Sequence, residues 1–237
     1  MLFYFIRHGD PDYSTDSLTP LGKRQAEAVA RRLSVRGLDR IYSSPMGRAR
    51  ETAQPTAEIL RLPVEIEDWT SEALAWEQLT EKDENGKTKW IHVRMQKPET
   101  CETERSILTM ENWADMPSMA GTGAKEGFAR IQAASDEFFA RQGYVREGAK
   151  FRIERPNNDR IALFSHGGFG VAFVSVLLGI PPQFILSSFE MPHCGISIFE
   201  FANHSDGYTC PRCLSYSDTS FQYQDRLPML YNNSIKI

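Results

Sequence analysis

The chain has 237 residues, of which 41% are hydrophobic and 24% charged, and its formal net charge is −4. This composition is typical of globular proteins and disfavours disordered, collagen-like and coiled-coil classes. The slight acidity argues against a nucleic-acid partner or an anionic membrane surface, because both need a basic face, so any anion site must be local.

The N-terminus and the cysteines bear on the location of the protein. The apolar opening at residues 2–6 is too short for an export signal and is interrupted by Arg7. The longest apolar stretch, residues 169–180, is shorter than the roughly 20 residues that span a bilayer. Four cysteines in a chain of this length do not form a disulfide-dense secreted scaffold. We therefore expect a cytoplasmic protein with no membrane partner.

Strand and helix signals alternate over the first 66 residues. Short β-favouring runs predict strands at residues 2–6, 40–43 and 63–66. Thr19 and Ser44 are each followed by proline and by apolar residues spaced three and four apart, which predicts a helix beginning at each. This alternation is typical of a parallel sheet covered by helices.

Residues 69–125 differ from their surroundings because they are polar and irregular, yet they contain all four tryptophans. A disordered linker would be poor in aromatic residues, so we expect an ordered insert or lid lying over the site. The alternative is that these tryptophans only pack the insert onto the core.

Regular signals return after the insert and complete the predicted fold. They are helices at 127–142 and 167–178 and strands at 160–165 and 195–201, followed by a turn-rich tail from Ser217. We expect one α/β domain spanning residues 1–237, a three-layer sandwich with a mostly parallel central sheet and helices on both faces.

Charged residues follow the predicted strands at the points where ligands bind in open α/β sheets, just beyond the strands' carboxyl ends. They are Arg7 and His8 after the first strand, Arg48 after the second, Glu67, Asp68 and Glu72 after the third, and His166 after the strand at 160–165. Two guanidinium groups and the helix start at Gly167 suit a phosphoryl group. Neutral imidazole is a nucleophile toward phosphorus, a carboxyl group can protonate the leaving alkoxide, and this chemistry requires neither metal nor cofactor.

Four sequence blocks carry a resemblance to a known family. They are Phe-Tyr-Phe-Ile-Arg-His-Gly at 3–9, Leu-Thr-Pro-Leu-Gly at 18–22, Ser-Ser-Pro-Met-Gly-Arg-Ala-Arg-Glu-Thr-Ala at 43–53, and Ser-His-Gly-Gly at 165–168. In order and approximate spacing the chain resembles the histidine phosphatase superfamily, in the branch related to phosphoglycerate mutase, over residues 1–201.

The resemblance implies a role for each matching residue. His8 would be the nucleophile that becomes phosphorylated, and Arg7, Arg48 and His166 would bind the transferring group. Glu72 is the best match for the acid/base, with Glu67 and Glu77 as alternatives. Arg50, close to Arg48 in the sequence, matches the pattern less well.

Two departures from the family pattern bear on the substrate. A Thr and an Asn that contact phosphate in many members are replaced by the segment Asp-Pro-Asp-Tyr-Ser at residues 10–14. In that segment only Ser14 could donate to phosphate, and we expect Asp10 and Asp12 to point away. Ala73, Leu74, Ala75 and Trp76 stand where the mutases carry basic and polar residues. An apolar wall favours a phosphatase over a mutase.

Two further features have structural interpretations. His193 precedes the strand at 195–201, so we expect it at the edge of the sheet opposite the site, in a packing role. Cys210 and Cys213 have the spacing of half a zinc site, but no second close pair accompanies them, so free thiols are favoured.

The sequence thus predicts a metal-independent phosphatase that hydrolyses a small phosphomonoester through a phosphohistidine. The alternatives are phosphoglycerate mutase-type transfer and a non-catalytic phosphate-binding protein on the same fold. The partner is a small phosphorylated substrate whose identity, like the oligomeric state, the sequence does not specify.

Overall fold

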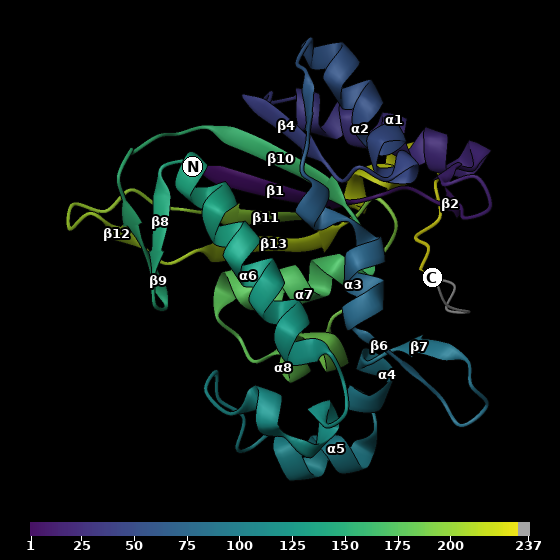
Figure 1. Cartoon of the computed structure of the whole chain (residues 1–237). Coiled ribbons are helices and arrows are strands. Elements are labelled where there is room, and N and C mark those ends of the chain that lie inside the picture. Colours follow the sequence, from purple (N-terminus) through teal and green to yellow (C-terminus); the bar gives the residue numbers. More distant parts are fainter. Residues whose placement is uncertain (232–237) are drawn as a thin grey trace.

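A six-stranded sheet forms the centre of the computed structural model, which describes residues 1–231 (Figure 1). Its strands are β1 (Leu2–Arg7), β4 (Arg40–Ser43), β5 (Val64–Ile66), β10 (Arg160–Ser165), β11 (Ile196–Glu200) and β13 (Arg212–Asp218), in the order β13-β11-β1-β10-β4-β5. β1, β10, β4 and β5 are parallel, whereas β11 runs antiparallel to its neighbours β1 and β13. The predicted mostly parallel sheet is confirmed.

Helices cover both faces of the sheet (Figure 1). They are α1 (Pro20–Ser34) and α2 (Gly47–Leu60) on one face, and α6 (Ala124–Arg141) and α7 (Gly167–Leu178) on the other. The alternation along β1 explains the two layers of core, since successive side chains of a strand point to opposite faces. Phe3 and Phe5 pack with the aromatic residues of α6 and α7, while Ile6 packs with the aliphatic residues of α1 and α2.

The remaining elements lie outside this three-layer core. They are β2 (Pro11–Asp12), β3 (Ser17–Leu18), α3 (Glu72–Gln78), β6 (Thr80–Lys82), β7 (Thr88–Trp90), α4 (His92–Met95), α5 (Pro98–Glu104), β8 (Tyr144–Glu147), β9 (Lys150–Ile153), α8 (Pro182–Ser188) and β12 (Tyr208–Thr209), with short 3-10 turns at Asp68–Thr70, Trp113–Asp115, Pro117–Met119 and Ser220–Asp225.

The insert at residues 69–125 is ordered, as the tryptophans predicted, and contains α3, the hairpin β6–β7, α4 and α5. Both interpretations of its tryptophans hold. Trp69, Trp90 and Trp113 pack against the main core, and Trp76 and Trp90 line a cleft described below. The aromatic residues therefore both anchor the insert and form part of the wall of that cleft.

Several elements were not predicted from the sequence. The hairpin β8–β9 pairs with β12 in a separate three-stranded sheet, and Gly148 makes its turn at a φ of 64°. Gly179, at a φ of 63°, ends α7, and the prolines at 181 and 182 begin α8, because proline suits the first turn of a helix. The turn-rich tail predicted from Ser217 begins inside β13, and its last residues, 232–237, lie outside the described part of the chain.

The predicted start of α2 at Ser44 is wrong, because the helix begins at Gly47. Ser44 instead continues the extended chain of β4, and its N–H donates to the carbonyl of Phe164 at 2.9 Å. The Ser44 hydroxyl accepts from Met46 N at 3.4 Å and lies 2.7 Å from His166 Nε2. In the described residues 1–231, no helix is both long and apolar enough to cross a bilayer.

Replacing Phe3 by alanine tests the aromatic core. Phe3 is fully buried, and its ring centroid lies 5.3 Å from that of Phe139 and 5.7 Å from that of Phe173. We expect Phe3→Ala to lower the free energy of unfolding by about 3–5 kcal/mol, because a large cavity is left. Urea denaturation measures the change. Tyr223→Ala, at a side chain that is 86% exposed, is the matched control and should change stability little.

Candidate active site

The parallel pairing of β1 with β10 brings two histidines together at the carboxyl ends of these strands. Arg7 pairs with Ser165 in the register, so His8 and His166 leave adjacent strands side by side. Their ring centroids lie 5.2 Å apart. The His8 backbone is held on both sides, because its N–H donates to Ser165 O at 2.9 Å and its carbonyl accepts from Cys194 N at 3.2 Å.

The His8 ring is oriented by a single bond to the backbone. Its Nδ1 lies 2.7 Å from the carbonyl oxygen of Gly9, which can only accept, so Nδ1 carries the proton. Nε2 is then unprotonated, and it is buried without a hydrogen-bond partner. Burial, followed by the neighbouring His166 and Arg7, lowers the pKa of His8 well below its usual value. The ring is therefore neutral at pH 7, with a free lone pair on Nε2.

Arg7 lies under the start of α7. Its guanidinium donates to the carbonyl of Met191, while its buried Nε has no partner. A Cβ at Gly167 would come within 3.0 Å of that Nε, so the close approach of the guanidinium to the helix requires glycine.

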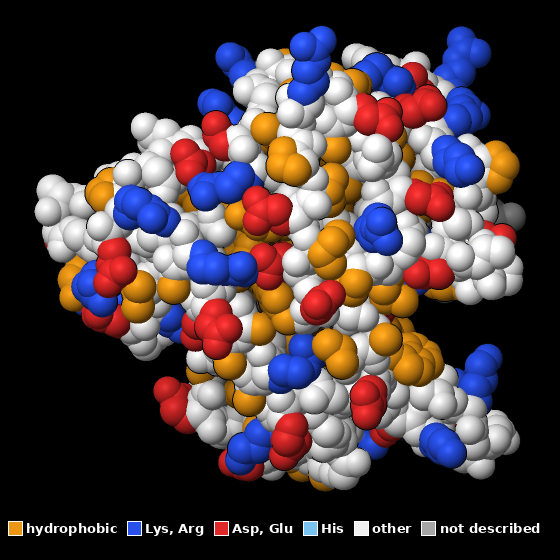
Figure 2. Space-filling model, turned by 45° about the horizontal axis from the view of Figure 1, so that its top comes forward, with side chains coloured by type: hydrophobic (Ala, Val, Ile, Leu, Met, Phe, Trp, Pro, Cys, Tyr) orange, Lys and Arg blue, Asp and Glu red, His pale blue; other side chains and the backbone are white. Residues whose placement is uncertain are grey.

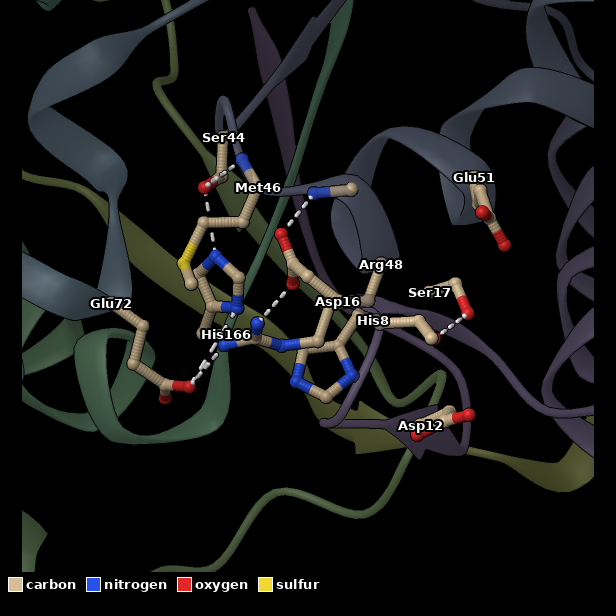
Figure 3. Close-up of polar contacts among 12 residues, drawn as sticks. His8, Asp12, Asp16, Ser17, Ser44, Met46, Arg48, Glu51, Glu72 and His166 are labelled. Atoms are coloured by element: carbon tan, nitrogen blue, oxygen red, sulfur yellow. Dashed lines mark hydrogen bonds and ion pairs between the residues drawn. The ribbon is translucent and has the colours of Figure 1, made fainter.

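Arg48 is held between two carboxylates at the first turn of α2 (Figure 3). One end of its guanidinium pairs with Asp16, and the other donates to Glu72 Oε2 at 2.9 Å. The Asp16 carboxylate also accepts from Gly47 N at 2.7 Å, at the N-terminus of α2. Tyr13 covers the guanidinium, with its ring centroid 5.3 Å from Arg48 Cζ.

Glu72 reaches the N-terminus of α7. Its Oε1 accepts from Gly168 N at 3.0 Å, and its Oε2 lies 3.7 Å from His166 Nδ1. The Glu72 carboxylate thus occupies the point where a guanidinium, a helix N-terminus and an imidazole converge. Such a point favours an anion.

His166 is the second buried imidazole of the site, and its Nε2 lies 2.7 Å from Ser44 Oγ. Burial, together with Arg48 and Arg7, lowers the pKa of His166 well below its usual value. Both imidazoles are therefore neutral at pH 7, and the positive charge of the site resides on the two arginines.

One trio of potential metal ligands occurs in the described chain. The ligand atoms of His8, Glu72 and His166 all lie within 4.8 Å of one another, and residues 1–231 contain no other such group of three or more. The adjacent guanidinium groups of Arg7 and Arg48 oppose a cation and favour an anion at this place. Cys210 is exposed and Cys213 is half-buried.

The predicted site residues Arg7, His8, Arg48, Glu72, His166 and Gly167 come together at this point, whereas other predicted candidates do not. Glu67 is buried against Arg141 and the Trp69 indole, Glu77 is exposed, and Arg50 lies on the outer surface of α2. Geometry therefore favours Glu72 among the glutamates and Arg48 among the arginines.

The segment after Gly9 folds back on itself. As expected, Asp10 and Asp12 are bonded away from the arginines, Asp10 to the Thr19 hydroxyl and Asp12 to Ser14. Ser14, expected to contact phosphate, is exposed, and its hydroxyl donates to Asp12 at 2.6 Å. Ser14 is not among the residues that line the cleft containing Arg7 and Arg48, so its contact with phosphate stays a prediction.

The predicted position of His193 is wrong. Its ring centroid lies 5.8 Å from that of His8, and it is buried beside Asp10. The reason is the direction of β11: because this strand is antiparallel to β1, its amino end lies at the carboxyl end of β1.

Sequence reasoning also missed Asp16 and Ser44. Asp16 adopts a φ of 50°, which aims its carboxylate at Arg48, and no short motif signals this geometry. Ser44 did carry a signal, because it directly follows a strand, as His8 and His166 do. Its position before a proline led to its interpretation as a helix cap instead.

A cleft of about 920 Å³ opens from the two arginines toward the insert. Its lining includes Tyr13, Asp16, Trp76, Trp90, His92, Val93, Leu186, Phe189 and Glu190, together with Arg7, Arg48, Glu72, Gly167 and Gly168. On the face drawn in Figure 2, hydrophobic side chains gather along the junction between the sheet body and the part of the molecule built by the insert.

Comparison with known proteins agrees with this geometry. The family model of the histidine phosphatase superfamily (branch 1) matches residues 3–210. A probable phosphoglycerate mutase GpmB of Yersinia enterocolitica is 27% identical over 196 residues, covering 76% of each chain. The GpmB protein of Serratia proteamaculans is 38% identical over 64 residues, which cover 23% of this chain and 30% of that protein.

Solved structures share the fold. The native mycobacterial glucosyl-3-phosphoglycerate phosphatase aligns with a TM-score of 0.59 at 21% identity, covering 92% of this chain and 99% of that one. Phosphoserine phosphatase from Entamoeba histolytica, in complex with 3-phosphoglyceric acid, aligns with a TM-score of 0.57 at 20% identity, covering 93% and 98%. With the family model matched from β1 to β12, the chain belongs to the histidine phosphatase superfamily.

Proposed function

We propose that the protein is a metal-independent phosphomonoester hydrolase that works through a phosphohistidine on His8. The observation that carries this proposal is the buried, unpartnered Nε2 of His8 beside groups that bind anions. A neutral imidazole nitrogen with a free lone pair is a competent nucleophile toward phosphorus.

In the first step, His8 Nε2 attacks phosphorus while the bond from phosphorus to the leaving oxygen breaks. Arg7, Arg48 and the N-terminus of α7 neutralise charge on the phosphoryl oxygens. Glu72, in its acid form, transfers a proton to the leaving oxygen, and the alcohol departs. The proximity of Glu72 to both histidines supports this assignment.

In the second step, a water oxygen attacks the phosphorus of phosphohistidine. Glu72, now a carboxylate, accepts a proton from that water, the P–N bond breaks, and orthophosphate is released. His8 Nε2 recovers its lone pair because Nδ1 keeps its proton against Gly9 O.

Substrate binding must displace Glu72 from its present position, because its carboxylate occupies the anion site. A phosphate dianion competes well there, since it offers more acceptor oxygens to Arg48 and to Gly168 N. The displaced carboxyl then lies next to the phosphoryl group, where a leaving-group acid is needed.

Phosphoglycerate mutase-type transfer is the second candidate, and the GpmB relatives favour it. It also passes through a phosphorylated histidine, but it must retain the product and return the phosphoryl group. The apolar residues Ala73 and Trp76 in the cleft support hydrolysis instead.

We also propose that residues 1–237 form one domain, in which the insert at 69–125 determines the substrate.

Replacing His8 by alanine should abolish hydrolysis, because it removes the Nε2 lone pair that attacks phosphorus. After rapid quenching with a radiolabelled phosphomonoester, the label should be found on the His8 peptide of the wild-type protein and be absent from His8→Ala. His204→Ala, at an exposed histidine, is the matched control and should keep both activity and label. Normal turnover by His8→Ala would refute the mechanism.

Replacing Glu72 by glutamine tests the acid. We expect kcat for alkyl phosphates to fall by about 10²- to 10⁴-fold, and kcat for 4-nitrophenyl phosphate to fall much less, because nitrophenolate needs no proton. Inorganic phosphate should bind more tightly, since the competing carboxylate is gone. Glu77→Gln is the control. An equal loss for both esters would exclude Glu72 as the acid.

The lowered pKa of His8 predicts how stability depends on pH. An unfolded histidine takes up a proton below about pH 6.5, whereas the folded His8 does not until the pH is much lower. The stabilisation is therefore complete above pH 6.5 and lost as the pH falls below it. In urea denaturation between pH 7.5 and 5, His8→Gln should lessen this decline by up to about 1.4 kcal/mol per pH unit. Parallel curves would contradict the lowered pKa.

A further inference from the structure

We infer that the leaving group of the substrate is an apolar alcohol or phenol of about aromatic-ring size that carries no negative charge. This inference rests on the proposed hydrolase function and specifies its substrate class. It is carried by the walls of the cleft and by the distribution of charge along them.

The walls of the cleft beyond the phosphoryl site are aromatic and aliphatic. Trp76 and Trp90 meet edge to face, with ring centroids 5.0 Å apart, and Val93, Leu186 and Phe189 continue the lining. Trp76 and Phe189 are 41% and 45% exposed, so both rings offer apolar surface to a molecule that enters the cleft. Rings of this kind favour another apolar ring.

Trp90 is locked in place against the start of α7. A Cβ at Gly168 would lie only 2.4 Å from the Trp90 ring, so the indole rests directly on the backbone that donates to Glu72. The apolar wall therefore begins immediately beside the point where the proposed leaving oxygen receives its proton.

The charges of the cleft are arranged for one anion only. Among the described lining residues, the cations are Arg7 and Arg48, and both belong to the phosphoryl site. The lining also carries the carboxylate of Glu190, which interacts electrostatically with Arg7 and His92. Burial lowers the pKa of His92, the remaining basic side chain of the lining, so it is neutral at pH 7.

A leaving group with its own carboxylate or second phosphate would meet this arrangement unfavourably. It would lose water against Trp76 and Trp90, face Glu190, and find no cation to pair with. For an uncharged ring in the same place, binding is favourable, because its apolar surface is removed from water. The cleft consequently discriminates against phosphoglycerate-like substrates.

Two primary alkyl phosphates test the inference: 2-phenylethyl phosphate and 3-phosphonooxypropanoate. They share the phosphoryl group and a primary alkoxide leaving group, and differ in a terminal phenyl or carboxylate. We expect kcat/KM for the phenyl ester to be at least about tenfold higher. Equal or reversed values would overturn the inference and leave the hydrolase proposal standing. Hydrolysis of neither ester would overturn both.

Two variants test whether Trp76 and Glu190 cause the expected preference for the phenyl ester. Trp76→Ala should lower kcat/KM for the phenyl ester about tenfold, through KM, and leave that for the carboxylate ester nearly unchanged. Glu190→Arg should raise kcat/KM for the carboxylate ester about threefold, as expected of an exposed charge. Glu27→Arg makes the same charge change on the exposed face of α1 and should alter neither ester. If Trp76→Ala lowers both esters equally, or Glu190→Arg behaves like Glu27→Arg, this account of the cleft is wrong.

Discussion

The parallel pairing of β1 with β10 is the constraint on which the site depends. It sets Arg7 opposite Ser165, so that the residues just after each strand, His8 and His166, meet without any long side chain having to reach. The aromatic core beneath Phe3 and Phe5 fixes this pair of strands in the middle of the sheet. Because the two histidines directly follow strands whose side chains are mostly buried, their positions are determined by the sheet.

The positions of site residues that directly follow a predicted parallel strand, or begin the helix after it, could be predicted from the sequence. Positions that depend on the direction of a later strand or on the conformation of a loop could not. The central strands and α7 are visible in the sequence because buried parallel strands and capped helices have strong local signals. The positions of Arg7, His8, Arg48 and His166 follow from them. His193 and Asp16 do not, because the first depends on the antiparallel direction of β11 and the second on a left-handed backbone in a loop. The hairpin β8–β9 could not be predicted from the sequence either, because its pairing with β12 joins residues that are far apart in the chain.

The protein's own carboxylates fill its anion site. Arg48 is neutralised by Asp16 on one side and by Glu72 on the other, and the first N–H groups of α2 and α7 are each bonded to one of them. These two ion pairs explain how Arg48 stays ordered although it is buried, whereas the buried guanidinium of Arg7 is held by the carbonyl of Met191. An unpaired buried guanidinium would be costly, so the carboxylates act as replaceable counterions.

The contact of Trp90 with Gly168 is one of the places where the insert meets the start of α7. On one side this glycine supports the wall that we propose selects the leaving group, and through its N–H it holds the carboxylate that we propose protonates it. Any side chain at that position would move both at once. A substitution at Gly168 would therefore change the wall and the proposed acid together, and a change confined to the wall would have to be made at other residues that line the cleft.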